Sequence, residues 1–397
     1  MKILWVKSDL LHPTTRGGQI RTLEILRRLK DRNTIDYVGF SNDPQGEAVH
    51  LSSEYCNRCF TVPQFLPPRA SLAFALQAAA GLFSPLPLAI SRYKSDQMRS
   101  RIDELIATNN YDSVVCDFPT PSPNIRRLEN CVLFQHNVET MIWERHAAQA
   151  RNAAEKVYMR MQANRMAAFE RDVCRKVRHI IAVSDEDASE MTRRFGVSNF
   201  SVVPTGVDAA RFTPPPEPSP FTADLVFLGS MDWLPNIDGM RWFIRDILPL
   251  IRRSAPNCSV AIVGRNPTRE VEEFAKSDPL IHVTGTVPDV RSWLWGAKLS
   301  IVPLRIGGGT RIKIYEAMAA KAPVVSTAVG AEGLSIHPPS DIRIGDTPDA
   351  FAEACLILLQ NAAARKAQAE QAWRLVTQNF GWDKIALRFE DILQAAR

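Results

Sequence analysis

The sequence predicts an α/β protein built from two doubly wound, Rossmann-like domains. Short and almost continuous apolar runs alternate with longer helix-like segments from one end of the chain to the other. Apolar runs without polar alternation are typical of strands buried on both faces of a parallel sheet, and regular alternation with helices predicts βαβ units. The length of 397 residues exceeds that of one ordinary domain and favours two.

The first half of the chain holds six expected strands, at residues 3–6, 34–40, 113–117, 132–136, 179–184 and 201–204. Helix-like segments lie between most of them, at residues 18–30, 97–107 and 185–195. The long segment 139–177 is helical by composition, with room for one break. Parallel sheets bind ligands beyond the carboxyl ends of their strands, so residues that follow these runs are the candidate site residues.

The second half repeats the pattern, with expected strands at 224–229, 259–264, 281–285, 299–303 and 323–327 and a helix at 237–253. Near the junction of the halves, residues 213–221 contain five prolines and form an extended, semi-rigid connector that could act as a hinge. We therefore expect an N-terminal domain at 1–204 and a C-terminal domain at 205–378.

Composition narrows the class of protein. The chain is 45% hydrophobic and 23% charged, which is typical of a globular enzyme rather than a disordered or membrane-spanning protein. A net charge of +5 fits an anionic ligand or a membrane surface but is too small to indicate nucleic acid. Of seven cysteines only Cys56 and Cys59 are close in sequence, and no second pair completes a zinc site. We expect reduced thiols in a cytoplasmic protein.

The most apolar segment, at residues 72–90, is interrupted by a glutamine, a glycine and two prolines, so it does not predict a membrane span. A partly buried helix followed by a loop is the simpler interpretation. The alternative is a patch over residues 72–99 that rests in a membrane interface, supported by Arg92, Lys94 and Arg99. In that case the protein would work at the inner face of the membrane.

A glycine-rich loop at 307–309, followed by a helix expected to open at about Thr310, is the most informative segment of the chain. Unpaired amides and the helix dipole attract anions at a helix start, and glycines allow a close approach. Arg311 and Lys313 add two cations where cations are disfavoured, which suggests an anionic ligand. The carboxylate of Glu316 could accept hydrogen bonds from sugar hydroxyls. This chemistry suits a sugar nucleotide. The alternative interpretation is an ordinary glycine loop followed by a surface helix.

Several sequence segments, in their order and spacing along the chain, resemble those of the GT-B nucleotide-sugar glycosyltransferases, particularly the retaining family 4. The resemblance covers nearly the whole chain, and its most specific segments are Val203-Pro-Thr-Gly-Val-Asp208, Phe227-Leu-Gly229, Ile262-Val-Gly264, Val283-Thr-Gly-Thr-Val-Pro-Asp289 and residues 307–334. It implies two domains that face each other across a cleft. Phe380-Gly-Trp382 looks like the start of the family's last helix, which implies a helix at 379–397 crossing back to the first domain.

The family implies a Glu-x7-Glu pair whose second member holds the donor ribose, and here that member is Glu316. Gly308 stands at the place of the first glutamate, which contacts the donor sugar in related enzymes. We expect the backbone amides of Gly308, Gly309 and Thr310 to take over part of that role.

A second departure follows Gly229. The family often has an arginine directly after this glycine and a lysine several residues on, but here the segment runs from Ser230 to Asn236 without either. We infer that Arg311 and Lys313 grip the diphosphate instead. The alternative is that Arg311 and Lys313 make only ion pairs at the protein surface.

In the first half, Gly17 and Gly18 follow the first strand but form no GxGxxG fingerprint, which argues against a dehydrogenase. The resemblance implies that they approach the donor phosphate or the acceptor, and a plain loop is the alternative. It also implies that His136, at the end of a strand, faces the cleft and contacts the donor sugar or assists the reaction; a structural histidine is the alternative. Glu139 and Glu144 are possible acceptor contacts or ordinary solvated carboxylates.

The sequence thus predicts a hexosyltransferase-type glycosyltransferase that moves a sugar from a UDP- or GDP-linked donor to a hydroxyl of a glycan or lipid-linked saccharide. His136, Arg311 and Lys313 are the candidate catalytic residues. We expect no Asp-x-Asp pair at a strand end, and therefore neither a metal ion that holds the diphosphate nor a cofactor. The resemblance implies retention and a role in polysaccharide assembly. Two alternatives are an inactive nucleotide-sugar-binding partner subunit and a sugar-nucleotide 2-epimerase.

Overall fold

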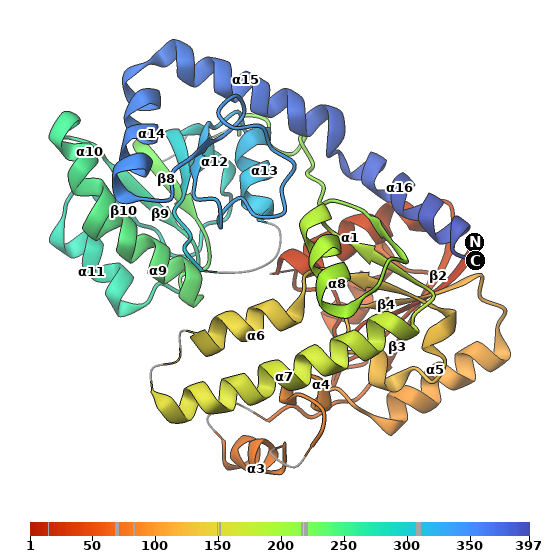
Figure 1. Ribbon diagram of the computed structural model, residues 1–397. Helices are drawn as coiled ribbons and strands as arrows, with labels where there is room; N and C mark the ends of the chain where they lie inside the picture. Colours follow the sequence, from red (N-terminus) through yellow and green to blue (C-terminus); the bar gives the residue numbers. More distant parts are fainter. Residues whose placement is uncertain are drawn as a thin grey trace. The chain divides into compact units, whose positions relative to one another are not determined.

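The computed structural model of the protein describes residues 1–14, 16–67, 71–81, 84–148, 150, 152–215, 217, 221–306 and 311–397 (Figure 1). The chain divides into two compact units, one formed by residues 1–204 with 382–397 and the other by residues 205–381. Of the predicted connector at 213–221, residues 216 and 218–220 lie outside the described residues. Each unit is described by itself.

The first unit is built on a seven-stranded parallel sheet in the order β3-β2-β1-β4-β5-β6-β7. Its strands are β1 (Lys2–Val6), β2 (Thr34–Phe40), β3 (Arg58–Val62), β4 (Ser113–Asp117), β5 (Cys131–Gln135), β6 (His179–Ala182) and β7 (Phe200–Val202). In register, Val6 pairs with Val38 of β2 on one side and Cys116 of β4 on the other. The strand order reverses between β1 and β4, so ligands are expected beyond the carboxyl ends of these two strands.

Helices cover both faces of this sheet (Figure 1). They are α1 (Gly17–Lys30), α2 (Glu47–His50), α3 (Leu72–Gly81), α4 (Leu88–Ser91), α5 (Asp96–Thr108), α6 (Glu139–Ala148), α7 (Ala153–Lys176), α8 (Asp185–Phe195) and α16 (Trp382–Ala395). Helix α16 packs against α1. Its Phe389 ring lies 5.5 Å from Trp5 and 4.9 Å from Phe134, which ties the end of the chain to the core of the sheet.

The second unit contains a six-stranded parallel sheet in the order β10-β9-β8-β11-β12-β13. The strands are β8 (Ala223–Leu228), β9 (Val260–Val263), β10 (Ile281–Val283), β11 (Ala297–Val302), β12 (Val324–Ser326) and β13 (Arg343–Ile344). Around it lie α9 (Leu234–Trp242), a π-helical turn (Phe243–Ile247), α10 (Leu248–Ser254), α11 (Arg269–Ser277), α12 (Arg291–Trp295), α13 (Ile312–Ala319), α14 (Pro348–Gln360) and α15 (Ala362–Asn379). The strand order here reverses between β8 and β11.

The predicted fold class is confirmed, with corrections to individual elements. The apolar runs form the central strands, but the edge strands β3 and β13 were not predicted. The segment 139–177 is divided into α6 and α7, with the Asn152 side chain accepting the Glu155 amide at the start of α7. The helix predicted to open at about Thr310 begins at Ile312, with Arg311 as its N-cap. Among the described residues, no helix is long and apolar enough to cross a membrane.

Candidate functional site

The turn after β8 lies at the point where the strand order of the second unit reverses, and it is very closely packed. A Cβ atom added to Gly229 would lie 2.6 Å from Asn236 Nδ2 and 2.9 Å from Lys313 Nζ. A Cβ on Gly264, at the end of the neighbouring β9, would lie 1.8 Å from the carbonyl oxygen of Gly229. Only glycine fits at position 264, whereas a side chain at position 229 would displace Asn236 and the Lys313 ammonium group, which lies close to the turn.

Helix α13 and its N-cap Arg311 carry the predicted cations and the carboxylate, and Lys313 lies at this turn. Ile314, Tyr315 and Met318 are buried in the core of the unit, which fixes the helix against the sheet. Lys313 and Glu316, three residues apart, lie together on the less buried face. The expected juxtaposition of one cation and one carboxylate on adjacent turns is therefore present.

Lys313 carries its charge at a cost in free energy. Its Nζ atom lies 3.3 Å from Asn236 Oδ1 and 4.4 Å from the centre of the Phe227 ring. Among the residues that the structure describes, it makes no ion pair. Burial and the neighbouring Arg311 lower the pKa of Lys313 to about 7, against the opposing effect of Glu316. A bound anion would supply the compensation that this ammonium lacks.

Arg311 and Glu316 complete the described part of this site. Arg311 is only 8% exposed, and its guanidinium carbon lies 5.3 Å from the centre of the Trp233 ring. Burial raises the pKa of Glu316, while Arg211 and Lys313 act in the opposite direction. Because Arg311 is buried and Lys313 has no paired carboxylate, this geometry does not favour the surface-ion-pair alternative. Gly308, Gly309 and Thr310 lie outside the described residues, so their predicted contacts stay predictions.

The first unit has a buried polar network where its strand order reverses. Asp117, at the end of β4, accepts hydrogen bonds from four side chains: Trp5 Nε1 at 2.9 Å, Lys7 Nζ at 2.8 Å, Thr22 Oγ1 at 2.7 Å and His136 Nε2 at 2.8 Å. Burial by itself raises the pKa of Asp117, but Lys7 and His136 hold it well below its ordinary value. Asp117 is therefore an ionised carboxylate at the centre of the network.

His136 lies at the end of β5, as predicted, but its ring is only 3% exposed. It stacks on Phe118 with ring centroids 4.0 Å apart, and its Nδ1 lies 3.1 Å from Nη1 of Arg21. Because Arg21 can only donate, Nδ1 accepts and Nε2–H donates to Asp117. Burial lowers the pKa of His136 to about 3. Both ring nitrogens are therefore occupied, which favours the structural alternative; the catalytic role stays a prediction.

The paired glycines open α1 beside this network. A Cβ added to Gly18 would lie 3.0 Å from the Phe118 ring and 3.6 Å from His136 Nδ1, so the absence of a side chain admits the stacked rings. Gly17 is exposed at the start of the helix. The structure thus gives Gly18 a packing role, and the predicted donor contacts of Gly17 and Gly18 stay predictions.

The carboxylate Glu170 was missed because a glutamate within a long helix looks solvated in sequence. It is fully buried and accepts the backbone N–H groups of Glu139 and Thr140, each at 2.9 Å. It therefore caps α6 from outside the helix. Burial raises the pKa of both Glu139 and Glu170 to about 7. Glu144 instead pairs with Arg194 at 2.8 Å.

The expectation that no Asp-x-Asp pair stands at a strand end is wrong: Asp185 and Asp187 form such a sequence three residues after β6 ends at Ala182. They lie in the first turn of α8, where Ser184 Oγ accepts the Asp187 amide at 3.0 Å and donates to Asp187 Oδ2 at 2.7 Å. Asp187 therefore takes part in the N-cap of α8 with Ser184. No cluster of three metal-ligating side chains occurs among the described residues.

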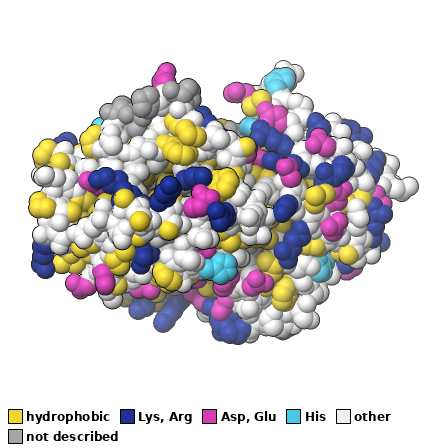
Figure 2. All heavy atoms as spheres, turned by 90° about the horizontal axis from the view of Figure 1, so that it is seen from above, with side chains coloured by type: hydrophobic (Ala, Val, Ile, Leu, Met, Phe, Trp, Pro, Cys, Tyr) yellow, Lys and Arg dark blue, Asp and Glu magenta, His cyan; other side chains and the backbone are white. Residues whose placement is uncertain are grey.

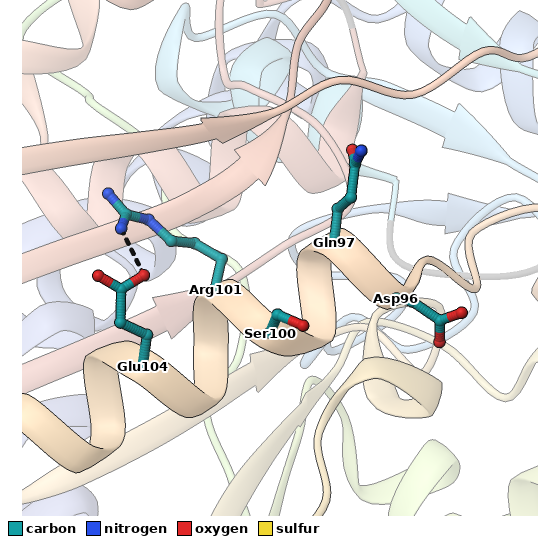
Figure 3. Close-up of a pocket in the computed structure, with 5 residues that line it drawn as sticks. All are labelled: Asp96, Gln97, Ser100, Arg101 and Glu104. Carbon is teal, nitrogen blue, oxygen red and sulfur yellow. Dashed lines mark hydrogen bonds and ion pairs between the residues drawn. The ribbon is translucent and has the colours of Figure 1, made fainter.

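Other surface features carry less chemistry. A pocket of about 430 Å³ is lined by five residues of α5 alone, and Arg101 pairs with Glu104 within it at 2.7 Å (Figure 3). On the face shown in Figure 2, Lys and Arg side chains are interspersed with acidic and hydrophobic ones. That face has no single large basic patch of the kind that nucleic-acid binding uses.

Two Rossmann-like parallel-sheet units in one chain define the GT-B class of fold. The family model for Glycosyltransferase Family 4 matches residues 15–211, and the model for Glycosyl transferases group 1 matches residues 222–361. The two glycosyltransferase models together match most of the chain, one in each unit, so the chain is a GT-B glycosyltransferase.

Two proteins with similar sequences cover different shares of the chain. An uncharacterised 44.6 kDa protein in the cps region of Klebsiella pneumoniae is 20% identical, with 97% of each chain covered. A D-inositol 3-phosphate glycosyltransferase of Xylanimonas cellulosilytica is 27% identical over 55% of this chain and 57% of the relative.

Among solved structures, sucrose-phosphate synthase from Thermosynechococcus elongatus has a TM-score of 0.72 at 15% identity, covering 99% of this chain and 98% of that one. HepE from Anabaena in complex with UDP and glucose has a TM-score of 0.67 at 14% identity, with both chains fully covered. These similarities establish the fold.

Proposed function

We propose that the protein transfers a hexosyl group from a UDP- or GDP-linked donor to a hydroxyl of a glycan or lipid-linked saccharide, with retention and without a metal ion. The observation that carries this proposal is the Lys313 ammonium beside Gly229, with Arg311 and Glu316 on the same helix start. The solved structure of HepE contains UDP and glucose, and the Klebsiella relative is encoded in a cps region. Both support a nucleotide-sugar donor and polysaccharide or glycoconjugate assembly.

The proposed chemistry follows from the charges at the site. Negative charge grows on the leaving diphosphate as its bond to the sugar breaks, and a fixed cation that gains in interaction with that charge lowers the barrier. Lys313 and Arg311 would supply this stabilisation, and the Glu316 carboxylate would accept hydrogen bonds from the ribose hydroxyls. The leaving phosphate would help remove the acceptor proton on the same face of the sugar. His136 is a further candidate catalytic residue, and its contacts also hold Arg21 and Phe118 in place.

Calorimetric titration with UDP, GDP, ADP and their monophosphates, with and without EDTA, tests the donor class. We expect tight binding of one diphosphate that EDTA does not weaken. Glu316→Gln should reduce its affinity by about tenfold or more, because a charge-assisted hydrogen bond to the ribose contributes about 1.5–3 kcal/mol. Unchanged affinity would remove Glu316 from the site. Binding without turnover of a labelled donor in cell extract would favour the inactive partner subunit.

We also propose that residues 72–99 contact an anionic membrane peripherally. Leu72 and Leu76 of α3 are 77% and 62% exposed, and Phe65 just before the helix is 77% exposed. Arg165 of α7 donates to the carbonyl of Gly81 at 2.7 Å, which anchors the end of this helix to the sheet domain. Exposed apolar side chains near cations are what an interfacial helix uses.

Flotation with vesicles containing phosphatidylglycerol tests the membrane contact. We expect the protein to float with these vesicles and to lose most of that binding in a Leu72→Ser/Leu76→Ser variant. A matched Ile106→Ser variant, which changes an exposed apolar residue of α5, should float like the original protein. Failure of the original protein to float would contradict the proposal.

A further inference from the structure

Arg265, directly after Gly264 at the end of β9, is anchored to the turn that contains Gly229. Its Nε donates to Ser230 Oγ at 2.9 Å, and its carbonyl accepts the Met231 amide at 2.9 Å. Ser230 Oγ in turn donates to Asp232 Oδ1 at 2.6 Å. Two neighbouring residues of the turn after β8 therefore fix both the backbone and the guanidinium of Arg265.

These contacts leave the outer edge of the guanidinium available. Among the described residues, neither Nη atom of Arg265 has a hydrogen-bond partner, and the side chain is partly exposed. The arginine after the neighbouring strand β11 differs: Arg305 donates from Nε and Nη2 to Asp238 at 3.1 and 2.7 Å. The charge of Arg305 is matched by a directly bonded carboxylate. Arg265 instead has Asp232 as an electrostatic neighbour through Ser230 Oγ, and its two Nη groups make no direct bond to a carboxylate among the described residues.

Arg265 and Lys313 approach the same turn from different elements. Lys313 Nζ lies against Gly229, and the Arg265 guanidinium is hydrogen-bonded to the next residue, Ser230. Ser230 itself contributes no charge. Cations held on both sides of a glycine turn can bind one anion with two negative groups, and an arginine fork fits two phosphate oxygens at once.

We propose that Arg265 binds the diphosphate of the donor, together with Lys313. This inference rests on the proposed function and extends it to a residue that neither the sequence motifs nor the family resemblance indicated. The hydrogen bond from Nε to Ser230 holds the fork in one orientation, so its two Nη groups meet the phosphate oxygens without a loss of side-chain freedom on binding.

Calorimetry with UDP, UMP and uridine, repeated with the guanine series, tests this role. Arg265→Gln should weaken diphosphate binding by about tenfold or more, since charge-assisted hydrogen bonds to phosphate are lost, and should weaken binding of the nucleoside much less. Arg265→Lys should recover part of the affinity. Arg269→Gln removes the same charge at an exposed position four residues on and should bind like the original protein.

The outcomes separate this inference from the proposed function. If the original protein binds a diphosphate and Arg265→Gln binds it equally well, the role of Arg265 is wrong and the proposed function stands. Equal losses for diphosphate and nucleoside would show that Arg265 only shapes the turn, which also overturns the inference. If the original protein binds no nucleoside diphosphate, both fail. Thermal unfolding of each variant checks that the fold is retained.

Discussion

Nucleoside diphosphate binding should weaken by up to tenfold per pH unit as the pH rises above 7, because Lys313 then loses its proton. Its pKa of about 7 in the free protein results first from burial and then from Arg311. The bound diphosphate favours the charged ammonium and raises that pKa, so binding takes up a proton above pH 7. One linked proton changes affinity tenfold per unit. Titrations between pH 7 and 9 measure the slope.

Lys313→Met provides the control for this prediction. Without the ammonium group we expect the affinity at pH 7 to fall by about ten- to a hundredfold, as charge-assisted hydrogen bonds to phosphate contribute about 1.5–3 kcal/mol. The dependence on pH between 7 and 9 should disappear with it. A slope that persists in the variant would assign the titration to another group, and Glu139 and Glu170 also have pKa values of about 7.

The same lowered pKa has a consequence for stability with the opposite sign. In the unfolded chain Lys313 has an ordinary pKa near 10.4, so between pH 7 and about 10 the unfolded chain binds a proton that the folded protein does not. The contribution of Lys313 to the free energy of unfolding therefore rises with pH over this range. Ligand affinity falls over the same range, because the anion binds the protonated form of Lys313, which burial and Arg311 disfavour in the folded protein.

The central strands and helix α13 could be predicted from the sequence because their signals are local. Continuous apolar runs marked strands buried on both faces, and the cations of α13 stand within three residues of each other. The short edge strands gave weaker signals: β3 is only partly buried along most of its length, and β13 has two residues. A strand with one exposed side lacks the continuous apolar run on which the prediction depended.

Residues that meet only through tertiary packing could not be predicted. Asp117 and Lys7 stand 110 positions apart, and each looks like an ordinary strand-end residue in the sequence. Arg265 and Ser230 lie at the ends of different strands, 35 positions apart. Sequence placed His136 at the end of its strand, but only the packing of Phe118, Arg21 and Asp117 around the ring shows that both of its nitrogens are occupied.

Replacing Asp117 with alanine should destabilise the first unit by about 3–5 kcal/mol, the range found when one partner of a buried ion pair is removed. Lys7 is only 3% exposed and lies 4.5 Å from the centre of the Phe118 ring, so its ammonium would lose its only described carboxylate partner in a buried environment. Trp5 Nε1 would lose its described acceptor at the same time. Thr22 Oγ1 would lose one of its two acceptors and keep the Gly18 carbonyl. Hydrogen exchange of peptides from β1 and β4, with β8 and β11 as internal controls, measures this loss unit by unit.

A double variant that removes both charges separates the ion pair from the rest of the network. Lys7→Met with Asp117→Asn removes both charges and keeps much of the volume, so we expect it to be less destabilised than Asp117→Ala. Because the pKa of Asp117 is held well below its ordinary value, its stabilising contribution is complete above about pH 4 and is lost as the pH falls further. A loss below about 1 kcal/mol for Asp117→Ala would mean that water or another group compensates Lys7, and that the network does not hold the strand ends together.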